Sequence, residues 1–261
     1  MRPFPIREIN IPDEITPEWF KAMVLQLQPD EGDDSNAEQQ IRLGLERKFG
    51  RDLADAFDEQ LQELLPPNAT DDQVRAAASR VTITSEPVRE VLRRSLEQGS
   101  SLGVSVAFDT LQNIGLGFDF TLAHTNAARW ASNYSYQLVQ GINATTQARL
   151  QTAVNDWFRE RTTLPDLVRE LEPTFGKRRA RLIAQTETTR SAAMGSTIGY
   201  QESGVVQQVE WRTAMDERRC VTCAPKEGKR APLSNPMVDG VEIPAHPGCR
   251  CWWVPVIEEP T

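Results

Sequence analysis

Two short stretches decide how the C-terminal part of this chain folds: CVTC at residues 220–223 and HPGCRC at residues 246–251. They contain all four cysteines of the chain and one of its two histidines. Thiol and imidazole groups clustered in this way are typical of a structural zinc site, because two closely spaced donors in a turn can point at one ion. The sequence therefore predicts that one metal ion joins the two stretches.

The second stretch offers more donors than a tetrahedral site needs. Cys220 and Cys223 supply two ligands, and His246 and Cys249 lie three residues apart around a Pro-Gly turn, so they can supply two more. Cys251 is the fifth candidate, but an extended backbone would point Cys249 and Cys251 to opposite faces and leave only one of them to bind. We expect one zinc ion with four protein ligands. Such a site has no position for water, so its role is structural rather than catalytic.

Two other interpretations of the cysteines stay open. Two disulfides could join the same two stretches. Alternatively, a catalytic zinc could keep a bound water, with Asp216 or Glu217 as the general base, although surface charge, or support of a metal ligand or a nearby arginine, is the more common role of such carboxylates. The His-x-Glu motif of nucleobase deaminases is absent, and so are phosphate-binding, dinucleotide-binding and GxSxG motifs.

The charge of the chain is acidic and unevenly distributed. The 261 residues carry a formal net charge of -8, which argues against a dedicated nucleic-acid-binding protein. Residues 30–65 hold eleven acids and four bases, whereas residues 177–230 hold eleven bases and six acids. No run of 18 apolar residues exists, and the N-terminus lacks the apolar core of a signal peptide, so we expect no membrane span and no export.

Periodic apolar residues predict a mostly helical chain. Residues 99–119 contain four glycines, which favours a loop or short strands there. Thr70 is expected to cap a short helix that runs to about Arg80. Gly141 is expected to end one helix and Thr145-Thr146 to cap the next, while Thr163 caps a short helix that Pro173 ends and Gly204 stops a long one. The expected helices cover residues 17–27, 37–65, 70–80, 85–98, 126–140, 145–158, 163–171 and 177–201, and the expected strands cover 205–213 and 251–257.

The predicted fold is mainly α (α+β), with a small β-containing, metal-clipped C-terminal subdomain. We divide the chain into an extended N-terminal arm and linker (1–36), a variable helical region (37–120), a second helical part (121–204) and the metal-clipped subdomain (205–261).

A basic run opens the long helix near residue 177. Lys177, Arg178, Arg179 and Arg181 could contact the phosphates of DNA. They could also be a solvated helix start, although basic residues there oppose the helix dipole. On the same helix Glu187 and Arg190 lie three residues apart and are placed to pair with each other.

The C-terminal motifs resemble the phage Mu F-like head morphogenesis family, the minor head proteins of tailed phages. The resemblance covers roughly residues 125–257 and leaves residues 1–120 unmatched. Five residues either belong to the family's motifs or could support the metal ligands: Glu187, Arg190, Trp211, Asp216 and Arg250. The matching stretches, in order, are VQGINATT at 139–146, IAQTETTR at 183–190, Gly204, WRT at 211–213, DE at 216–217, CVTC at 220–223, Gly228, Pro244 and HPGCRC at 246–251.

The resemblance implies a structural minor capsid protein, made in the host cytoplasm and built into the virion near the portal. It would act in head assembly, or in genome packaging and delivery, without catalysis and without a downstream toxin domain. Its partners would be the portal protein, other head proteins and packaged genomic DNA, with no membrane and no small-molecule substrate. The alternatives are a zinc-dependent nuclease or hydrolase and a free DNA-binding zinc protein.

Overall fold

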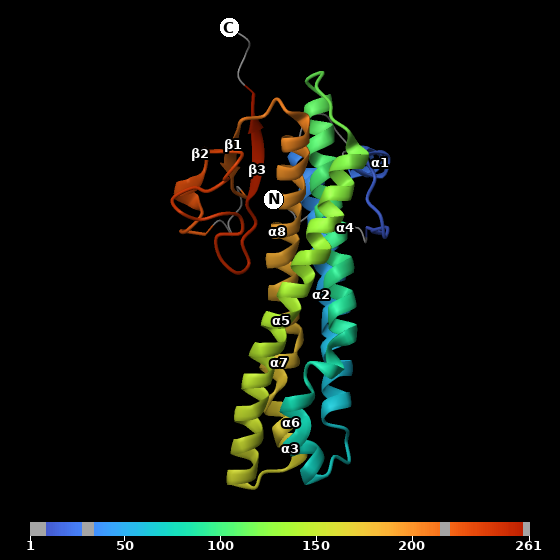
Figure 1. The fold of residues 1–261 in the computed structure, drawn as a ribbon, viewed down its shortest axis with the longest axis vertical. Helices are drawn as coiled ribbons and strands as arrows, with labels where there is room; N and C mark the ends of the chain where they lie inside the picture. Colours follow the sequence, from blue (N-terminus) through green and yellow to red (C-terminus); the bar gives the residue numbers. More distant parts are fainter. Residues whose placement is uncertain (1–8, 28–33, 215–219, 258–261) are drawn as a thin grey trace. The chain divides into compact units, whose positions relative to one another are not determined.

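The structure, a computed structural model, describes residues 9–27, 34–214 and 220–257. It confirms the predicted class: helices dominate, and a small sheet lies near the C-terminus (Figure 1). The helices are α1 (Pro17–Leu27), α2 (Asp34–Leu64), α3 (Asp71–Arg80), η1 (Ile83–Ser85), α4 (Glu86–Gln112), α5 (Phe120–Glu160), α6 (Leu164–Glu170), α7 (Glu172–Phe175), α8 (Lys177–Ser203) and η2 (Ala224–Lys226). The strands are β1 (Gln208–Arg212), β2 (Arg230–Pro232) and β3 (Trp252–Val256).

The chain forms two compact units, and each is built from separated stretches of sequence. Unit 1 comprises the described residues up to Glu46, Ser95–Ala131 and the described residues from Gln185 onward. Unit 2 comprises Arg47–Arg94 and Ser132–Ala184. The domain boundaries expected after residues 36, 120 and 204 follow chain order and stay a prediction.

Unit 2 is an all-helical bundle with its own apolar core. The apolar residues of α2 recur every three or four positions, and Leu53, Phe57 and Leu64 are fully buried. Phe57 also meets Phe175 edge to face, with ring centroids 6.4 Å apart. As predicted, Thr70 and Thr163 cap α3 and α6 through reciprocal side-chain and backbone hydrogen bonds.

In unit 1, α4 and α8 cross at glycines. The loop or short strands predicted for residues 99–119 are wrong for residues 99–112, which are helical, whereas residues 113–119 do form a loop. Helix α4 continues to Gln112. A Cβ on Gly103 would clash with the carbonyl of Ala192, and one on Gly195 would clash with the carbonyl of Ser100. The Ser196 hydroxyl donates to the Gly103 carbonyl at 3.1 Å. These glycines allow two helices to approach closely and do not break either of them.

Helix α5 is continuous from Phe120 to Glu160, so the break predicted at Gly141 is wrong. The hydroxyls of Thr145 and Thr146 donate to the carbonyls of Gly141 and Ile142 at 2.9 and 2.8 Å. They thus bond back along the helix instead of capping a new one. The short helix after Thr163 ends before Pro173, which lies in the first turn of α7 rather than acting as a stop.

The sheet of unit 1 is antiparallel, with strand order β2-β1-β3. Trp211 of β1 lies opposite Trp253 of β3, and their rings meet edge to face with centroids 5.1 Å apart. Gly204 adopts a φ of 67° and ends α8 as predicted. The two predicted strands correspond to β1 and β3. Both are shorter than expected but lie within the predicted ranges.

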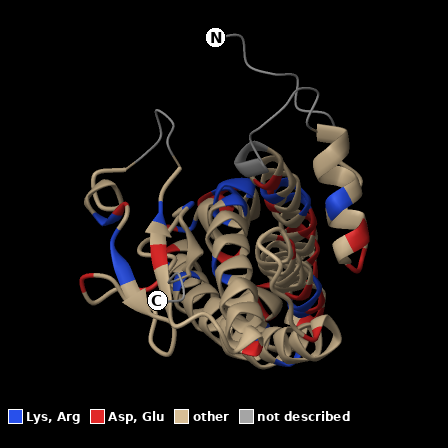
Figure 2. Cartoon of the chain, turned by 90° about the horizontal axis from the view of Figure 1, so that it is seen from above, with Lys and Arg blue, Asp and Glu red and all other residues tan. Residues whose placement is uncertain are grey.

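Charged residues of both signs occur on the helices and on the β-containing segment (Figure 2). Many of the ion pairs join residues three or four apart on one helix, such as Lys48 with Asp52 and Arg169 with Asp166. Pairs of this kind contribute little to stability. In the part of the chain that the structure describes, no helix is both long enough and apolar enough to cross a bilayer.

Candidate metal centre

The two ligand stretches emerge at the same end of the sheet. The first follows β1, which ends at Arg212, and the second precedes β3, which begins at Trp252. These two residues are paired in the antiparallel ladder. Because the end of one antiparallel strand lies beside the start of its partner, the sheet brings CVTC and HPGCRC together.

Tight turns orient the donors within each stretch. The backbone N–H groups of Cys223 and Ala224 donate to the carbonyl of Cys220 at 3.2 and 3.0 Å. In the second stretch the N–H of Cys249 donates to the carbonyl of His246 at 3.1 Å. Gly248, inside that turn, has a φ of 78°, a conformation that glycine adopts without strain.

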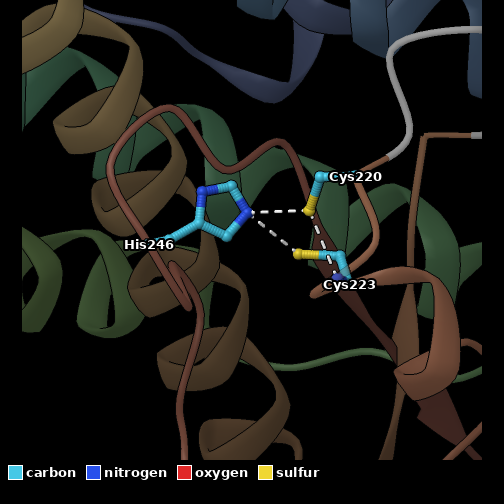
Figure 3. Close-up of side chains that lie close together, drawn as sticks. All are labelled: Cys220, Cys223 and His246. Carbon is cyan, nitrogen blue, oxygen red and sulfur yellow. Dashed lines mark hydrogen bonds between the residues drawn. The ribbon is translucent and has the colours of Figure 1, made fainter.

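The imidazole of His246 points between two thiols (Figure 3). Its Nε2 lies 3.0 Å from Sγ of Cys220 and 3.2 Å from Sγ of Cys223. On the other side, Sγ of Cys223 lies 3.8 Å from Sγ of Cys249. Cys251 joins this second group, whose sulfur atoms all lie within 4.8 Å of one another. Cys223 therefore belongs to two overlapping donor groups that together contain all five predicted residues.

The spacing of Cys223 and Cys249 fits a tetrahedral ion. Zinc–sulfur bonds of about 2.3 Å place two sulfur ligands about 3.8 Å apart. The Cys223–Cys249 distance has this value. Soft thiol donors with one imidazole form the donor set that structural metal sites use. All four cysteines are free thiols in the structure, so this Cys/His group can hold a metal ion.

The second ring nitrogen of His246 has its own partner. Nδ1 lies 2.9 Å from the carbonyl oxygen of Pro247, so Nδ1–H donates there. This fixes the tautomer with the lone pair on Nε2, the atom that faces the thiols.

Hydrogen bonds and burial make the thiols unequal. The hydrogen bond from Cys251 lowers the pKa of Cys249, although burial opposes it. The same contact raises the pKa of Cys251, and burial raises the pKa of Cys223. Burial opposes ionisation of Cys220, but hydrogen bonds, first that from the backbone N–H of Cys223, lower its pKa as well. Thiolates thus form most readily at Cys220 and Cys249. Metal binding, which needs deprotonated thiols, must release protons from the others.

The expectation that Cys249 and Cys251 point to opposite faces is not met. Residues 249–251 precede β3 and are not part of a strand, so the alternation of an extended chain does not apply to them. Both side chains are buried and turn toward Cys223.

Polar side chains of α8 hold the second ligand stretch, a role that was not predicted from the sequence. Gln185 Nε2 donates to the Gly248 carbonyl at 3.1 Å, and the Gly248 N–H donates to the hydroxyl of Thr186 at 2.9 Å. The hydroxyl of Thr189 donates to the carbonyl of Cys249 at 2.7 Å. A run of threonines in the interior of a helix was the available signal.

Glu187 and Arg190 pair as predicted. Arg190 Nε lies 3.1 Å from Oε2 of the buried Glu187, and Arg190 also lies 3.6 Å from Glu242. Trp211 is fully buried in the core of unit 1.

Of the remaining predicted supporting residues, the structure describes Arg250 but not Asp216 or Glu217. Arg250 lies between the two cysteines of the second stretch and lines a small pocket together with Cys220 and His246. Asp216 and Glu217 lie outside the described residues.

The basic run at the start of α8 is not uniform. Lys177, Arg178 and Arg181 are exposed. Arg179 is turned inward: its guanidinium donates to the hydroxyl of Thr146 at 2.9 Å and to the carbonyl of Thr174 at 2.7 Å. Burial, and then the charge of nearby Arg149, lower the pKa of Arg179 to about 10, so it is still charged at neutral pH. Arg179 is thus engaged within unit 2, and the other three face solvent.

Comparison with known proteins agrees with the resemblance seen in the sequence. Residues 138–254 match the family model described as Phage Mu protein F like protein. This segment includes the α8 residues that hold the ligand stretch and all five candidate ligands. No curated protein and no solved structure matches the chain.

Proposed function

Over residues 138–254 this is a phage Mu F-like protein, and from this match we propose its function. The chain is a structural minor head protein of a tailed phage. It would be built into the virion near the portal vertex and would act in head assembly, or in genome packaging and delivery. The family match carries this proposal. The Cys/His cluster supports it, since two groups of three donors share Cys223 and each could hold a metal ion.

The metal in this proposal is a single zinc ion. Cys220, Cys223, His246 and Cys249 would hold it, with Cys251 beside them as the alternative fourth ligand. When bound, zinc would tie the end of β1 to the start of β3 as a structural cross-link. The contacts of α8 with Gly248 and Cys249 then attach this cross-link to the helical part of unit 1.

Native mass spectrometry of the purified protein tests the metal. We expect about one zinc per chain and its loss in a Cys223→Ser variant, because Cys223 belongs to both donor groups. Cys249→Ser and Cys251→Ser, compared side by side, identify the fourth ligand, since only the true ligand lowers zinc content strongly. Two disulfides and no metal in the native protein would reject this site.

The head function is tested in phage particles. Purified virions should contain the protein in small copy number, and cross-linking mass spectrometry should join it to the portal protein. Phage that lack the gene should fail to form infectious heads. A protein absent from virions that cleaves DNA in a metal-restored reaction, lost on Glu217→Gln or Asp216→Asn, would instead be the nuclease or hydrolase alternative.

A further inference from the structure

A buried arginine from α2 reaches the metal-ligand loop. Arg42 is only 6% exposed. One of its guanidinium nitrogens, Nη2, donates to the hydroxyl of Thr189 at 3.1 Å and lies 3.5 Å from the carbonyl of Cys251. Arg42 precedes the Mu F-like segment by almost a hundred residues, so it lies outside the segment that the family model matches.

Thr189 connects Arg42 to a second point of the same loop. Its hydroxyl accepts a hydrogen bond from Arg42 and donates one to the carbonyl of Cys249 at 2.7 Å. The carbonyls of both Cys249 and Cys251 are therefore held by one chain of contacts that runs from α2 through α8. The ligand sulfur atoms are attached to the backbone that these contacts fix.

The positive charge of the buried Arg42 needs a compensating negative charge nearby. Burying a cation costs several kcal/mol unless negative charge compensates for it. None of the ion pairs found among the described residues includes Arg42. Glu38, one turn earlier, has its pKa raised by burial, although the charge of Arg42 opposes this. A zinc ion with three thiolates and one imidazole carries a net charge of -1, and this charge would lie beside the loop that Arg42 contacts.

We propose that Arg42 is a positioning residue for the metal centre, which makes zinc retention depend on the docking of α2. The inference rests on the proposed zinc site. By linkage the dependence is reciprocal: zinc stabilises the first turns of α2 in unit 1 by as much as docked α2 stabilises bound zinc. The zinc site, through Arg42, then links α2, which lies outside the segment matched by the family model, to the Mu F-like segment.

The test uses the full chain with Arg42→Ala, Arg42→Lys and, as a matched control, Arg47→Ala, which removes an exposed arginine from the same helix. Zinc affinity is measured by competition with a chromogenic chelator. Loss of a group that orients metal ligands typically lowers metal affinity about 10–100-fold, and we expect Arg42→Ala to do so. Arg42→Lys should lie between wild type and Ala, because a single nitrogen makes both contacts of Arg42. Arg47→Ala should match wild type.

Hydrogen exchange separates positioning from general stabilisation. Removing zinc from the wild-type protein should speed amide exchange in residues 37–46, whereas the same treatment should change little in Arg42→Ala. If Arg42→Ala fails to fold, the wild-type exchange data and Arg42→Lys still decide the matter. The proposal would be overturned if wild type and the Arg42 variants bound zinc with equal affinity. It would also be overturned if removal of zinc from the wild-type protein left the rate of amide exchange in residues 37–46 unchanged. A wild-type protein that binds no zinc would instead reject the metal site itself.

Discussion

At Glu227 three hydrogen bonds converge on one carboxylate beside the first ligand stretch. The backbone N–H and the hydroxyl of Thr213 donate to Oε2 at 2.6 and 2.7 Å, and Arg212 donates to Oε1 at 3.0 Å. Burial alone would raise the pKa of Glu227, but these bonds outweigh it and hold the pKa below 4.5. The carboxylate thus anchors the chain where it leaves β1.

The first prediction concerns this pKa. A carbon-detected NMR titration of the Glu227 carboxyl group should give a midpoint below 4.5, and Thr213→Val, which removes one donor, should move it upward. Since the folded-state pKa is depressed, Glu227 stabilises the fold above about pH 4.5, and this contribution is lost as pH falls through the folded-state pKa. A midpoint at or above 4.5 in the wild-type protein would contradict the anchoring role.

The clustering of the candidate metal donors could be predicted because their chemistry and spacing are local, while their role as ligands stays a prediction. Cys220 and Cys223 lie in one turn, as do His246 and Cys249, and each pair can be recognised in a few residues of sequence. Arg42 could not be found in this way. It meets Cys251 across 209 residues of sequence, and a single arginine on a helix carries no signal of a distant partner.

At the level of elements, the main errors came from glycine and threonine. Gly103 and Gly141 both weaken helix propensity, so both were expected to interrupt helices. The structure gives them opposite surroundings. Gly103 faces the backbone of α8, while a Cβ on Gly141 would meet nothing within 4 Å. Packing against α8 keeps Gly103 helical. Gly141 stays helical because it lies in the middle of the long helix α5, with helical residues on both sides.

These two glycines make a matched pair for the second prediction. Gly103→Ala should lower the free energy of unfolding by about 1–3 kcal/mol or more, because the new methyl group clashes with the backbone of α8. Gly141→Ala should raise it by about 0.5–1 kcal/mol, because alanine loses less backbone entropy in an open helical position. Urea denaturation of both variants measures the difference. Shifts of the same sign would show that the crossing is not tightly packed.

The caps and strands were better predicted than the helix interiors. Thr70 and Thr163 form the expected caps, and Gly204 ends α8, because each of these signals acts within one turn. The pairing partners of β1 depend on residues distant in sequence, and no local pattern predicted the order β2-β1-β3.

On the scale of the whole molecule, the charge limits how the protein can meet DNA. The net charge of -8 repels phosphate, and only part of the basic run faces solvent. With Arg179 engaged inside unit 2, three exposed cations are left at the start of α8: Lys177, Arg178 and Arg181. Any contact with a packaged genome through this site would therefore be weak and sensitive to salt.

Fluorescence anisotropy with a duplex oligonucleotide tests this third prediction. Three phosphate contacts give a slope of about -2.7 in the logarithm of affinity against the logarithm of salt concentration, with little binding left at physiological salt. Replacing all three cations by glutamine should bring the slope near zero, whereas Lys21→Gln, an exposed lysine on α1, should leave it unchanged. Tight, sequence-selective binding at physiological salt would favour the free DNA-binding protein instead.

The crossing of α4 and α8 also governs how the chain tolerates change. At the crossing, Gly103 of α4 and Gly195 of α8 each lie against a backbone carbonyl of the other helix. If one helix slid along the other, a residue with a side chain would replace a glycine there and clash with main-chain atoms. Helix α8 is thereby held in one alignment, and the same helix presents Gln185, Thr186 and Thr189 to the loop that carries Cys249. An added methyl group at Gly103 would therefore shift the loop that carries Cys249, a candidate metal ligand that the methyl group itself does not touch.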